Sequence, residues 1–379
     1  MNSFRLILDV SASSALATKT IQRINVAGLK LLHSDPENCT PTAITRTPRV
    51  FYGLWVRDRL TLQCVKLVVQ PENFQNFVAV KDLSLVNVEF TGNLHEFFTY
   101  FRALKVLKLI DLNITTISPT VLSGIDGKLE QLMIGGGKRV IEPKSFEKFH
   151  QLQNLTLRNC QLTDLQVDIF EGLEQLHYLN LGSNEISVLC NDTFSKLTQL
   201  SELHLDDNRI SEIQAEAFSG LNLRTIDLRN NSLTSVPVGV FRNLLDLETL
   251  NLGLNKIRTV SYNDFCGCIQ LRWLNLDYNE IYHIDASAFW GFNFNILDLS
   301  HNNLTVLDDN TFIGLTVSDL LDLRANNITQ IKSQAFNNLS AKKVLLCHHN
   351  STYVGRDNWS VEDTITEIAI CDCTSTEYS

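Results

Sequence analysis

The stretch LHYLNLGSNEISVLCNDTF, from Leu176 to Phe194, reads Leu-x-x-Leu-x-Leu and then places one asparagine, Asn184, among apolar positions. The last two leucines alternate with polar residues, which is the period of a β-strand with one buried face. A polar side chain at a position that the pattern marks as buried needs hydrogen-bond partners inside the protein. Copies of the pattern elsewhere in the chain indicate what those partners are.

The arrangement recurs along the chain with a period of 24 or 23 residues. Every repeated asparagine is followed ten residues later by a phenylalanine, so the register is fixed within each unit. The asparagines are Asn184, Asn208, Asn231, Asn255, Asn279, Asn302 and Asn326, and the phenylalanines are Phe194, Phe218, Phe241, Phe265, Phe289, Phe312 and Phe336.

Units of this length, each with one short strand, pack on their neighbours and align the strands in a parallel sheet. The bulkier segment with the phenylalanine needs more room on the far side, so the stack is expected to bend toward the sheet. From about Leu83 to Leu339 the pattern resembles the 24-residue extracellular leucine-rich repeat. It is similar to secreted leucine-rich repeat proteins and to Toll-like receptor ectodomains. The resemblance implies an α/β solenoid, a horseshoe with a parallel concave β-sheet and an irregular or short helical convex side.

The repeated asparagine has a physical role in such a coil. Where the chain turns inward after the strand, backbone N–H and C=O groups lose their ladder partners, and an amide can both accept and donate. The column of asparagines resembles the asparagine ladder of this family. Toward the amino end, Cys160, Gly137, Leu112 and Val88 take the position. A cysteine is a weak buried donor, whereas Val88 and Leu112 cannot bond at all, so their coils must turn differently.

The sequence divides into four segments by this pattern. Residues 1–35 are predicted to be a leader or signal segment, 36–80 an amino-terminal cap, 81–340 the repeats in about eleven coils, and 341–379 a carboxyl-terminal cap and tail. Within the first cap, RLTLQCVKLVV is predicted to be an edge strand. Cys39 and Cys64 bracket this cap and are predicted to form a disulfide, and one pair among Cys347, Cys371 and Cys373 is predicted to be bridged at the other end.

Composition narrows the function class and the compartment. A formal charge of −10 does not favour binding to nucleic acid or anionic lipid. The sequence contains no run of eighteen apolar residues, so no membrane span is predicted. The start of the chain resembles a secretory signal, with Arg5, an apolar run, and Ala15 and Ala17. Sequons for N-glycosylation indicate an extracellular glycoprotein, secreted or at the cell surface; they are Asn38, Asn113, Asn154, Asn191, Asn230, Asn303, Asn327, Asn338, Asn350 and Asn358.

No reaction motif appears in the sequence, and an open sheet lacks the enclosed pocket that catalysis usually needs. The chain is therefore predicted not to be an enzyme and to carry no cofactor. Cys347, His348, His349, Cys371 and Cys373 have the residue types of a zinc site. The Cys-x-Cys spacing is not a usual zinc knuckle, so no metal site is predicted.

Residues between the strand leucines are predicted to face the concave side and to bind an extracellular protein ligand. Trp273 stands out, because a large ring at an exposed strand position has the character of an interface anchor. A glycan on Asn154 would cover the earlier coils and move binding toward Trp273. The candidate binding residues are Tyr178, Glu202, His204, Arg224, Arg229, Arg272, Trp273, Asp277 and Tyr278.

The leading functional hypothesis is thus a secreted or cell-surface protein-recognition module. Two alternatives remain open at this point: a fragment of a Toll-like or adhesion receptor ectodomain, and a non-catalytic subunit or inhibitor of an enzyme.

Overall fold

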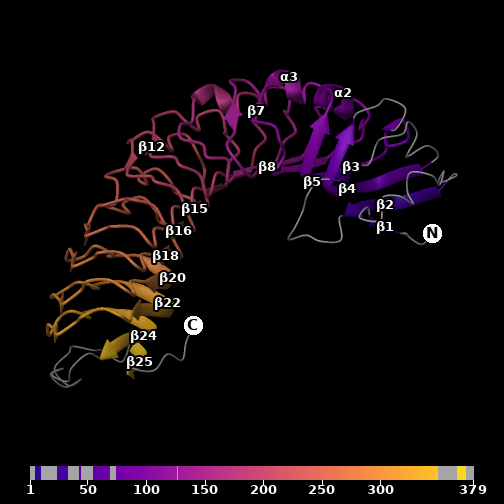
Figure 1. The fold of residues 1–379 in the computed structure, drawn as a ribbon. Coiled ribbons are helices and arrows are strands. Elements are labelled where there is room, and N and C mark those ends of the chain that lie inside the picture. The colour runs from indigo at the N-terminus through magenta and orange to yellow at the C-terminus, as the bar shows by residue number, and fades with distance from the viewer. Residues whose placement is uncertain are drawn as a thin grey trace. The chain divides into compact units, whose positions relative to one another are not determined.

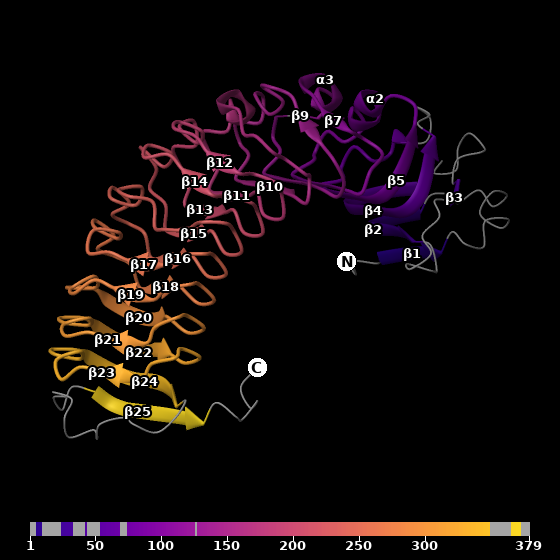
Figure 2. The same cartoon turned by 60° about the vertical axis from the view of Figure 1, so that its left-hand side comes forward.

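The structure is a computed structural model that describes residues 5–9, 24–32, 42–43, 54–68, 74–125, 127–348 and 365–372. The contacts divide the chain into two compact units. The first unit comprises Met1–Asn184 with Lys196–Gln199, and the second comprises Glu185–Ser195 with Leu200–Ser379. In both units the strands of successive coils lie side by side (Figures 1 and 2).

The first unit is built on parallel strands that pair in chain order. Its pairs run β1 to β2 to β4 to β5 to β6 to β8 to β10 to β11, with β3 against the far end of β4. The strands are β1 (Arg5–Asp9), β2 (Ile24–Leu32), β3 (Thr42–Ala43), β4 (Leu54–Val68), β5 (Asp82–Thr91), β6 (Val106–Ile110), β8 (Gln131–Gly135), β10 (Asn154–Arg158) and β11 (Tyr178–Asn180).

The second unit repeats this plan with shorter strands at its start. Parallel pairs run β13 to β15 to β16 to β18 to β20 to β22 to β24 to β25. These strands are β13 (Glu202–His204), β15 (Thr225–Asp227), β16 (Thr249–Asn251), β18 (Trp273–Asn275), β20 (Asn293–Asp298), β22 (Thr316–Leu323), β24 (Ser340–His348) and β25 (Ile365–Asp372).

Away from these sheets, the coils carry two-residue strands and a few short helices. The paired strands are β7 (Thr116–Ile117) with β9 (Val140–Ile141), β12 (Val188–Leu189) with β14 (Glu212–Ile213), β17 (Thr259–Val260) with β19 (His283–Ile284), and β21 (Val306–Leu307) with β23 (Gln330–Ile331). The helices are α2 (Leu94–Phe98), α3 (Pro119–Leu122) and the 3₁₀ turn η1 (Val167–Phe170). Across the described residues, none of the helices has the length and apolar character needed to cross a membrane.

This architecture is a parallel β-solenoid with little helix, which confirms the fold class predicted from the repeats. One prediction about its start was wrong. The strand β4, which contains RLTLQCVKLVV up to Val68, is not an edge strand, because β2 pairs along one side of it and β5 along the other. Leu60 and Leu62 of this strand are fully buried, as expected for a strand inside the sheet.

The repeated asparagines are buried in the second unit and at the end of the first, with 3% to 8% of their surface exposed. Asn279 is representative: its Oδ1 accepts from the backbone N–H of Ile257 at 2.9 Å, and its Nδ2 donates to the carbonyl oxygens of Leu252 at 3.0 Å and Leu276 at 3.1 Å. Each amide therefore joins the turn of its own coil to the coil before it.

A left-handed backbone turn precedes each of these asparagines. The residue before the asparagine has a φ between 49° and 56°, a conformation that reverses the direction of the chain at the end of the strand. Side chains at these positions consequently sit at the rim of the coil rather than on the sheet. The residues are Ser183, Asp207, Asn230, Leu254, Tyr278, His301 and Ala325.

The phenylalanines of the second unit form a file opposite the sheet. Successive rings lie 5.9 to 6.4 Å apart between centroids, with planes inclined by 20° or less, in the pairs Phe194–Phe218, Phe218–Phe241, Phe265–Phe289, Phe289–Phe312 and Phe312–Phe336. The first unit instead gathers its rings in a cluster. Phe74, Phe77, Phe97, Phe98 and Phe101 have centroids 5.0 to 6.4 Å apart and planes inclined by 37° to 88°.

Candidate recognition surface

From β13 to β22, the exposed sheet face of the second unit presents two columns of side chains, one residue of each column per strand. The strand register defines them, because parallel partners point to the same face. The first column is Glu202, Thr225, Thr249, Trp273, Ile296 and Leu320, and the second column is His204, Asp227, Asn251, Asn275, Asp298 and Asp322.

On the adjacent strands β18, β20 and β22, the first column consists of three large apolar residues. Trp273 keeps 46% of its surface exposed, and Ile296 and Leu320 are half-buried beside it in register. Sheet faces in contact with water usually carry polar residues. Three neighbouring apolar side chains on this face therefore form an apolar segment that contact with another molecule would desolvate favourably.

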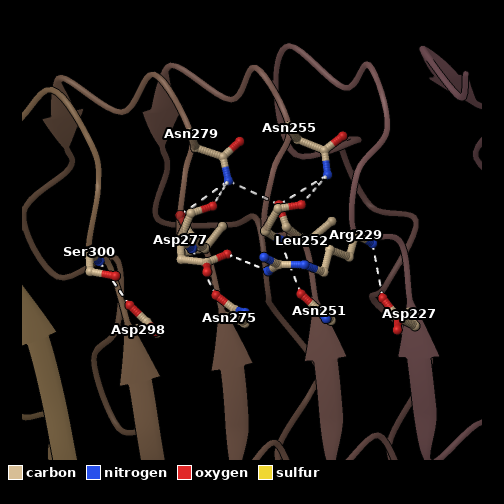
Figure 3. A network of polar contacts seen from close by, with 12 residues as sticks. Asp227, Arg229, Asn251, Leu252, Asn255, Asn275, Asp277, Asn279, Asp298 and Ser300 are labelled. Carbon is tan, nitrogen blue, oxygen red and sulfur yellow. Dashed lines mark hydrogen bonds and ion pairs between the residues drawn. The ribbon is translucent and has the colours of Figure 1, made fainter. Parts of the chain in front are cut away.

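The second column is held rigid by short turns at the strand ends. In five of its six members, Oδ1 accepts a hydrogen bond from the backbone N–H two residues later, at 2.8 to 3.1 Å. This is the local bond that Asn and Asp favour in turns. His204 is the sixth member, and its imidazole replaces the amide or carboxylate. The five are Asp227, Asn251, Asn275, Asp298 and Asp322 (Figure 3 shows four of the five).

A salt bridge next to this column spans two coils. The Nη1 of Arg229 lies 2.8 Å from Oδ1 of Asp277, and the bond passes over Gly253 in the coil between them (Figure 3). A Cβ on Gly253 would lie 1.9 Å from that oxygen and 2.6 Å from the nitrogen. The absence of a side chain at Gly253 is therefore what allows the two charges to meet.

Burial shapes the electrostatics of the column. It raises the pKa of Asp298 above its ordinary value, with the neighbouring Asp322 and Asp277 adding to the effect, against the opposing hydrogen bonds from Ser300. It also raises the pKa of Asp227, aided by the Asp206 carboxylate and opposed by the backbone bond from Arg229. The polar edge of this surface thus contains carboxyl groups that are partly desolvated.

Beyond the sheet, Tyr278 and His301 stack at the rim of the coils. Their ring centroids are 4.0 Å apart and the planes differ by 7°. Both residues occupy the left-handed position before a ladder asparagine. Tyr278 was predicted to lie on the sheet face, but at this position it lies at the adjacent rim of the coil. Tyr278 remains 47% exposed and extends the aromatic surface near the Trp273 strand.

The other candidate binding residues are distributed over both units. Tyr178 belongs to the first unit, where its Oη accepts from Nδ2 of Asn180 at 3.0 Å. Arg224 is exposed, 3.8 Å from Glu248, and Arg272 donates to the carbonyl oxygen of Asn293 at 2.9 Å. The structure brings Trp273, Asp277, Tyr278 and Arg229 into neighbouring coils, while Glu202 and His204 lie at the start of the second unit.

Sequence reasoning missed the partners of Trp273. Ile296 and Leu320 occupy the same place in their coils as Trp273, yet they read as ordinary apolar residues among many. Aligning the units on their asparagines would have found them, because the first-column position is fixed relative to the ladder. Gly253 was also missed, and its signal was a residue without a side chain at a position that bears Arg229 and Asp277 in the flanking coils.

The cysteines fall into two groups. Among the described residues, Cys160, Cys190, Cys266 and Cys268 are free thiols, and burial raises the pKa of Cys160 to about 11. At the ladder position, the Sγ of Cys160 donates to the carbonyl oxygen of Ile134 at 3.5 Å. Cys64 is disulfide-bonded, while Cys39, its predicted partner, lies outside the described residues together with Cys373. Cys347 and Cys371 are register partners on β24 and β25.

The sequons lie partly within the described residues. Asn38, Asn350 and Asn358 are outside them, as are His349 and most of the predicted leader. Asn154 lies half-buried on β10, in register with Tyr178 on the sheet face of the first unit. Its glycosylation, like that of the other sequons, stays a prediction.

These features define a class of protein: a solenoid of stacked coils, each with one parallel strand, a buried amide at the inward turn and a phenylalanine opposite the sheet. Residues 150–210, 198–235, 221–281 and 269–327 match the model of the leucine rich repeat family. Residues 150–327 thus consist of leucine-rich repeats, as the sequence pattern predicted. No curated protein sequence matches the chain.

Solved structures share the fold at low sequence identity. A chain of the Drosophila Toll–Spatzle complex superposes with a TM-score of 0.70 and 19% identity, over 91% of this chain and 49% of that chain. A chain of the mouse RP105/MD-1 complex superposes with a TM-score of 0.69 and 22% identity, over 85% of this chain and 55% of that chain. A leucine-rich repeat protein of Leptospira interrogans superposes with a TM-score of 0.62 and 19% identity, over 88% of this chain and 92% of that chain. The chain thus spans about half the length of the first two.

Proposed function

We propose that this chain is an extracellular protein-recognition module, secreted or held at the cell surface, that binds a protein ligand on the exposed sheet face of its second unit. The observation that carries the proposal is the apolar segment of Trp273, Ile296 and Leu320 on three adjacent strands. The sequence predicts that this face is concave, so a ligand would contact several coils at once.

The surroundings of the apolar segment have the composition of a protein interface. Such interfaces place aromatic anchors at the centre and charged groups at the rim. Here the coil of Trp273 also carries Asp277 of the Arg229–Asp277 bridge and Tyr278, which stacks on His301. The polar side chains of the second column and of the bridge are held in place before binding, by the turns at the strand ends and by the ion pair, which lowers the entropy lost on association.

The solved relatives give further support for a protein ligand. Toll was solved with Spatzle and RP105 with MD-1, so two proteins of similar fold are known in complexes. Solenoids of this kind are typically non-catalytic, and we propose no reaction for this chain. An extracellular location agrees with the sequons, with the signal-like start, and with the proposed disulfides Cys39–Cys64 and Cys347–Cys371.

The test is a binding screen of the full chain against purified secreted and cell-surface proteins, followed by affinity measurements on each hit. Trp273→Ala should weaken the Kd by about thirtyfold, the effect of losing an anchor worth about 2 kcal/mol. Trp290→Ala is the matched control, because Trp290 is 62% exposed but lies next to the phenylalanine file. Hits that respond to Trp290→Ala and ignore Trp273→Ala, or a screen without hits, would contradict the proposal.

A second candidate function is part of a receptor ectodomain of the Toll-like or adhesion type. The observation that favours it is the coverage of about half of the Toll and RP105 complex chains. Sequencing the transcript beyond the codon for Ser379 tests it, since a receptor requires further coils and an apolar span downstream. A stop codon at that point would exclude this second candidate while leaving the recognition module in place.

A further inference from the structure

Three metal-ligating side chains converge on the first two strands of the second unit. His204 ends β13, Asp227 ends β15 in register with it, and Asp206 follows two residues after His204. One ligand atom from each lies within 4.8 Å of the others, and all three residues are half-buried. The Nδ1 of His204 is 4.0 Å from Oδ2 of Asp227.

The cluster arises because this coil has a histidine at the second-column position, where the other strands have Asp or Asn. The other members use Oδ1 to bond the backbone N–H two residues later, whereas His204 has an imidazole there. Asp227 keeps that bond, since its Oδ1 accepts from the N–H of Arg229 at 3.0 Å. This bond orients the carboxylate so that Oδ2 faces His204, as an outer hydrogen bond orients a metal ligand.

We propose that His204, Asp206 and Asp227 form a binding site for one divalent transition-metal ion, with Zn²⁺ as the favoured ion. An imidazole nitrogen with two carboxylate oxygens suits zinc and disfavours calcium or magnesium, which prefer oxygen ligands alone. Three protein ligands leave a fourth position open on the exposed sheet face. This proposal does not rest on the protein ligand proposed above.

The required movement is small. Zinc binds these atoms at about 2.0 to 2.2 Å in tetrahedral geometry, which places ligand atoms about 3.4 Å apart. Ligand atoms that lie within 4.8 Å of one another have to approach by about 1.4 Å at most to reach this spacing. Charge also favours a cation, because two carboxylates face each other in a partly desolvated site.

Arg229, two residues after Asp227, pairs with a carboxylate outside the cluster. Its Nη1 lies 2.8 Å from Oδ1 of Asp277, and the open space over Gly253 allows this arrangement.

A second group of the same residue types shows what the site requires. His283 places Nε2 3.2 Å from Asp285 and Nδ1 3.9 Å from Asp308, so its two nitrogens address different carboxylates. Lys332 lies 2.6 Å from Asp308 and already supplies a positive charge. We expect no metal binding there, which makes His283 a matched control on the same unit.

The experiment is calorimetric titration of ZnCl₂ into the full chain after alkylation of its exposed thiols, which removes Cys190 and Cys266 as competing ligands. We expect one site, and a loss of affinity of at least about tenfold in His204→Ala and in Asp227→Asn. Asp227→Asn keeps the Oδ1 acceptor, as Asn251 and Asn275 do, so its fold is preserved. His283→Ala should bind as the parent chain does.

Two readouts separate binding from folding. Thermal unfolding with and without Zn²⁺ should show a stabilisation in the parent chain and in His283→Ala that is absent in the other two variants. Co²⁺ in place of Zn²⁺ should give the weak visible bands of nitrogen and oxygen ligands, without the strong near-ultraviolet absorption of thiolate ligands. The proposal would be overturned if the parent chain did not bind Zn²⁺, if the Co²⁺ spectrum showed thiolate ligands, or if all variants bound Zn²⁺ with equal affinity.

Discussion

Val88 and Asn279 hold equivalent places in their coils, yet the chain satisfies the backbone around them in different ways. At Asn279, one amide bonds four backbone groups of two coils. At Val88, β5 passes through the same left-handed conformation, at Asn87 with a φ of 49°, but continues to Thr91, and its register with β4 resumes from Val88 onward. This coil therefore accommodates an apolar residue at the ladder position because its strand continues beyond it.

Leu112 illustrates a third arrangement, again in the first unit. Its carbonyl oxygen accepts from Nη2 of Arg139 at 3.0 Å, and Arg139 is 7% exposed. A guanidinium from the next coil thus supplies a donor to this turn, as the amides do in the later coils, although it cannot accept from a backbone N–H. The second unit uses one residue type to bond the turn, whereas the early coils of the first unit use a continued strand and an arginine.

The largest effect should come from removing a ladder amide in the second unit. Asn279→Leu leaves the buried N–H of Ile257 without its partner, and it removes one of two amide donors from the carbonyl oxygens of Leu252 and Leu276, which keep Asn255 and Asn302. With about 1 to 3 kcal/mol for the unsatisfied N–H and about 0.5 to 1.5 kcal/mol for each of the two lost bonds, we expect a loss of about 4 kcal/mol. Urea unfolding followed by circular dichroism measures it.

Asn222→Leu is the matched control for this change, because Asn222 is exposed in the same unit. Its stability should stay within about 0.5 kcal/mol of the parent chain. Equal losses in the two variants would mean that the buried amides do not carry the turn.

Arg139→Met breaks the arrangement of the first unit. The methionine retains much of the arginine's apolar stem but cannot donate to the buried carbonyl oxygen of Leu112. One unsatisfied acceptor costs about 2 kcal/mol, roughly half of the loss at Asn279. Lys138→Met, at the exposed neighbouring position, should change the free energy of unfolding by less than about 0.5 kcal/mol. A neutral Arg139→Met would show that this coil turns without a buried donor.

The regular coils were predictable because one unit repeats, so each asparagine and phenylalanine could be placed from its neighbours. The start of the chain lacks the Leu-x-x-Leu-x-Leu signature, and β4 was consequently assigned to an edge although β2 pairs with it. The strand β2, from Ile24 to Leu32, lies within the segment predicted to be a leader.

Contacts between coils were the least predictable features of the candidate site. The Arg229–Asp277 bridge joins residues 48 apart, across a coil that contributes only Gly253. A pattern read one unit at a time identifies each residue as polar and exposed, but it does not show that two such residues meet. The same limit hid the convergence of Asp206 and Asp227 on His204, which requires the register of two strands.

The smallest effect concerns charge in the second column. Its counterparts in the first unit, in strand register, are Ser84, Lys108, Met133, Thr156 and Asn180, with no carboxylate. In the second unit burial raises the pKa of Asp298 above 3.8, so folding disfavours its ionised form. Asp298→Asn removes this penalty and keeps an acceptor for the N–H of Ser300.

The sign of the pH effect follows from the raised pKa. At a pH above the raised pKa, Asp298 is ionised in the folded and the unfolded state, and the folded state bears the full cost of the buried charge. As the pH falls through this pKa, the folded state binds the proton first and the cost disappears. We therefore expect Asp298→Asn to be more stable than the parent chain at pH 7, by about half a kcal/mol or less, and to lose this advantage toward pH 4. Urea unfolding at both pH values measures it, with exposed Asp246→Asn as the control. An advantage that persists unchanged at pH 4 would point to packing rather than charge, and would remove the electrostatic distinction between the two units.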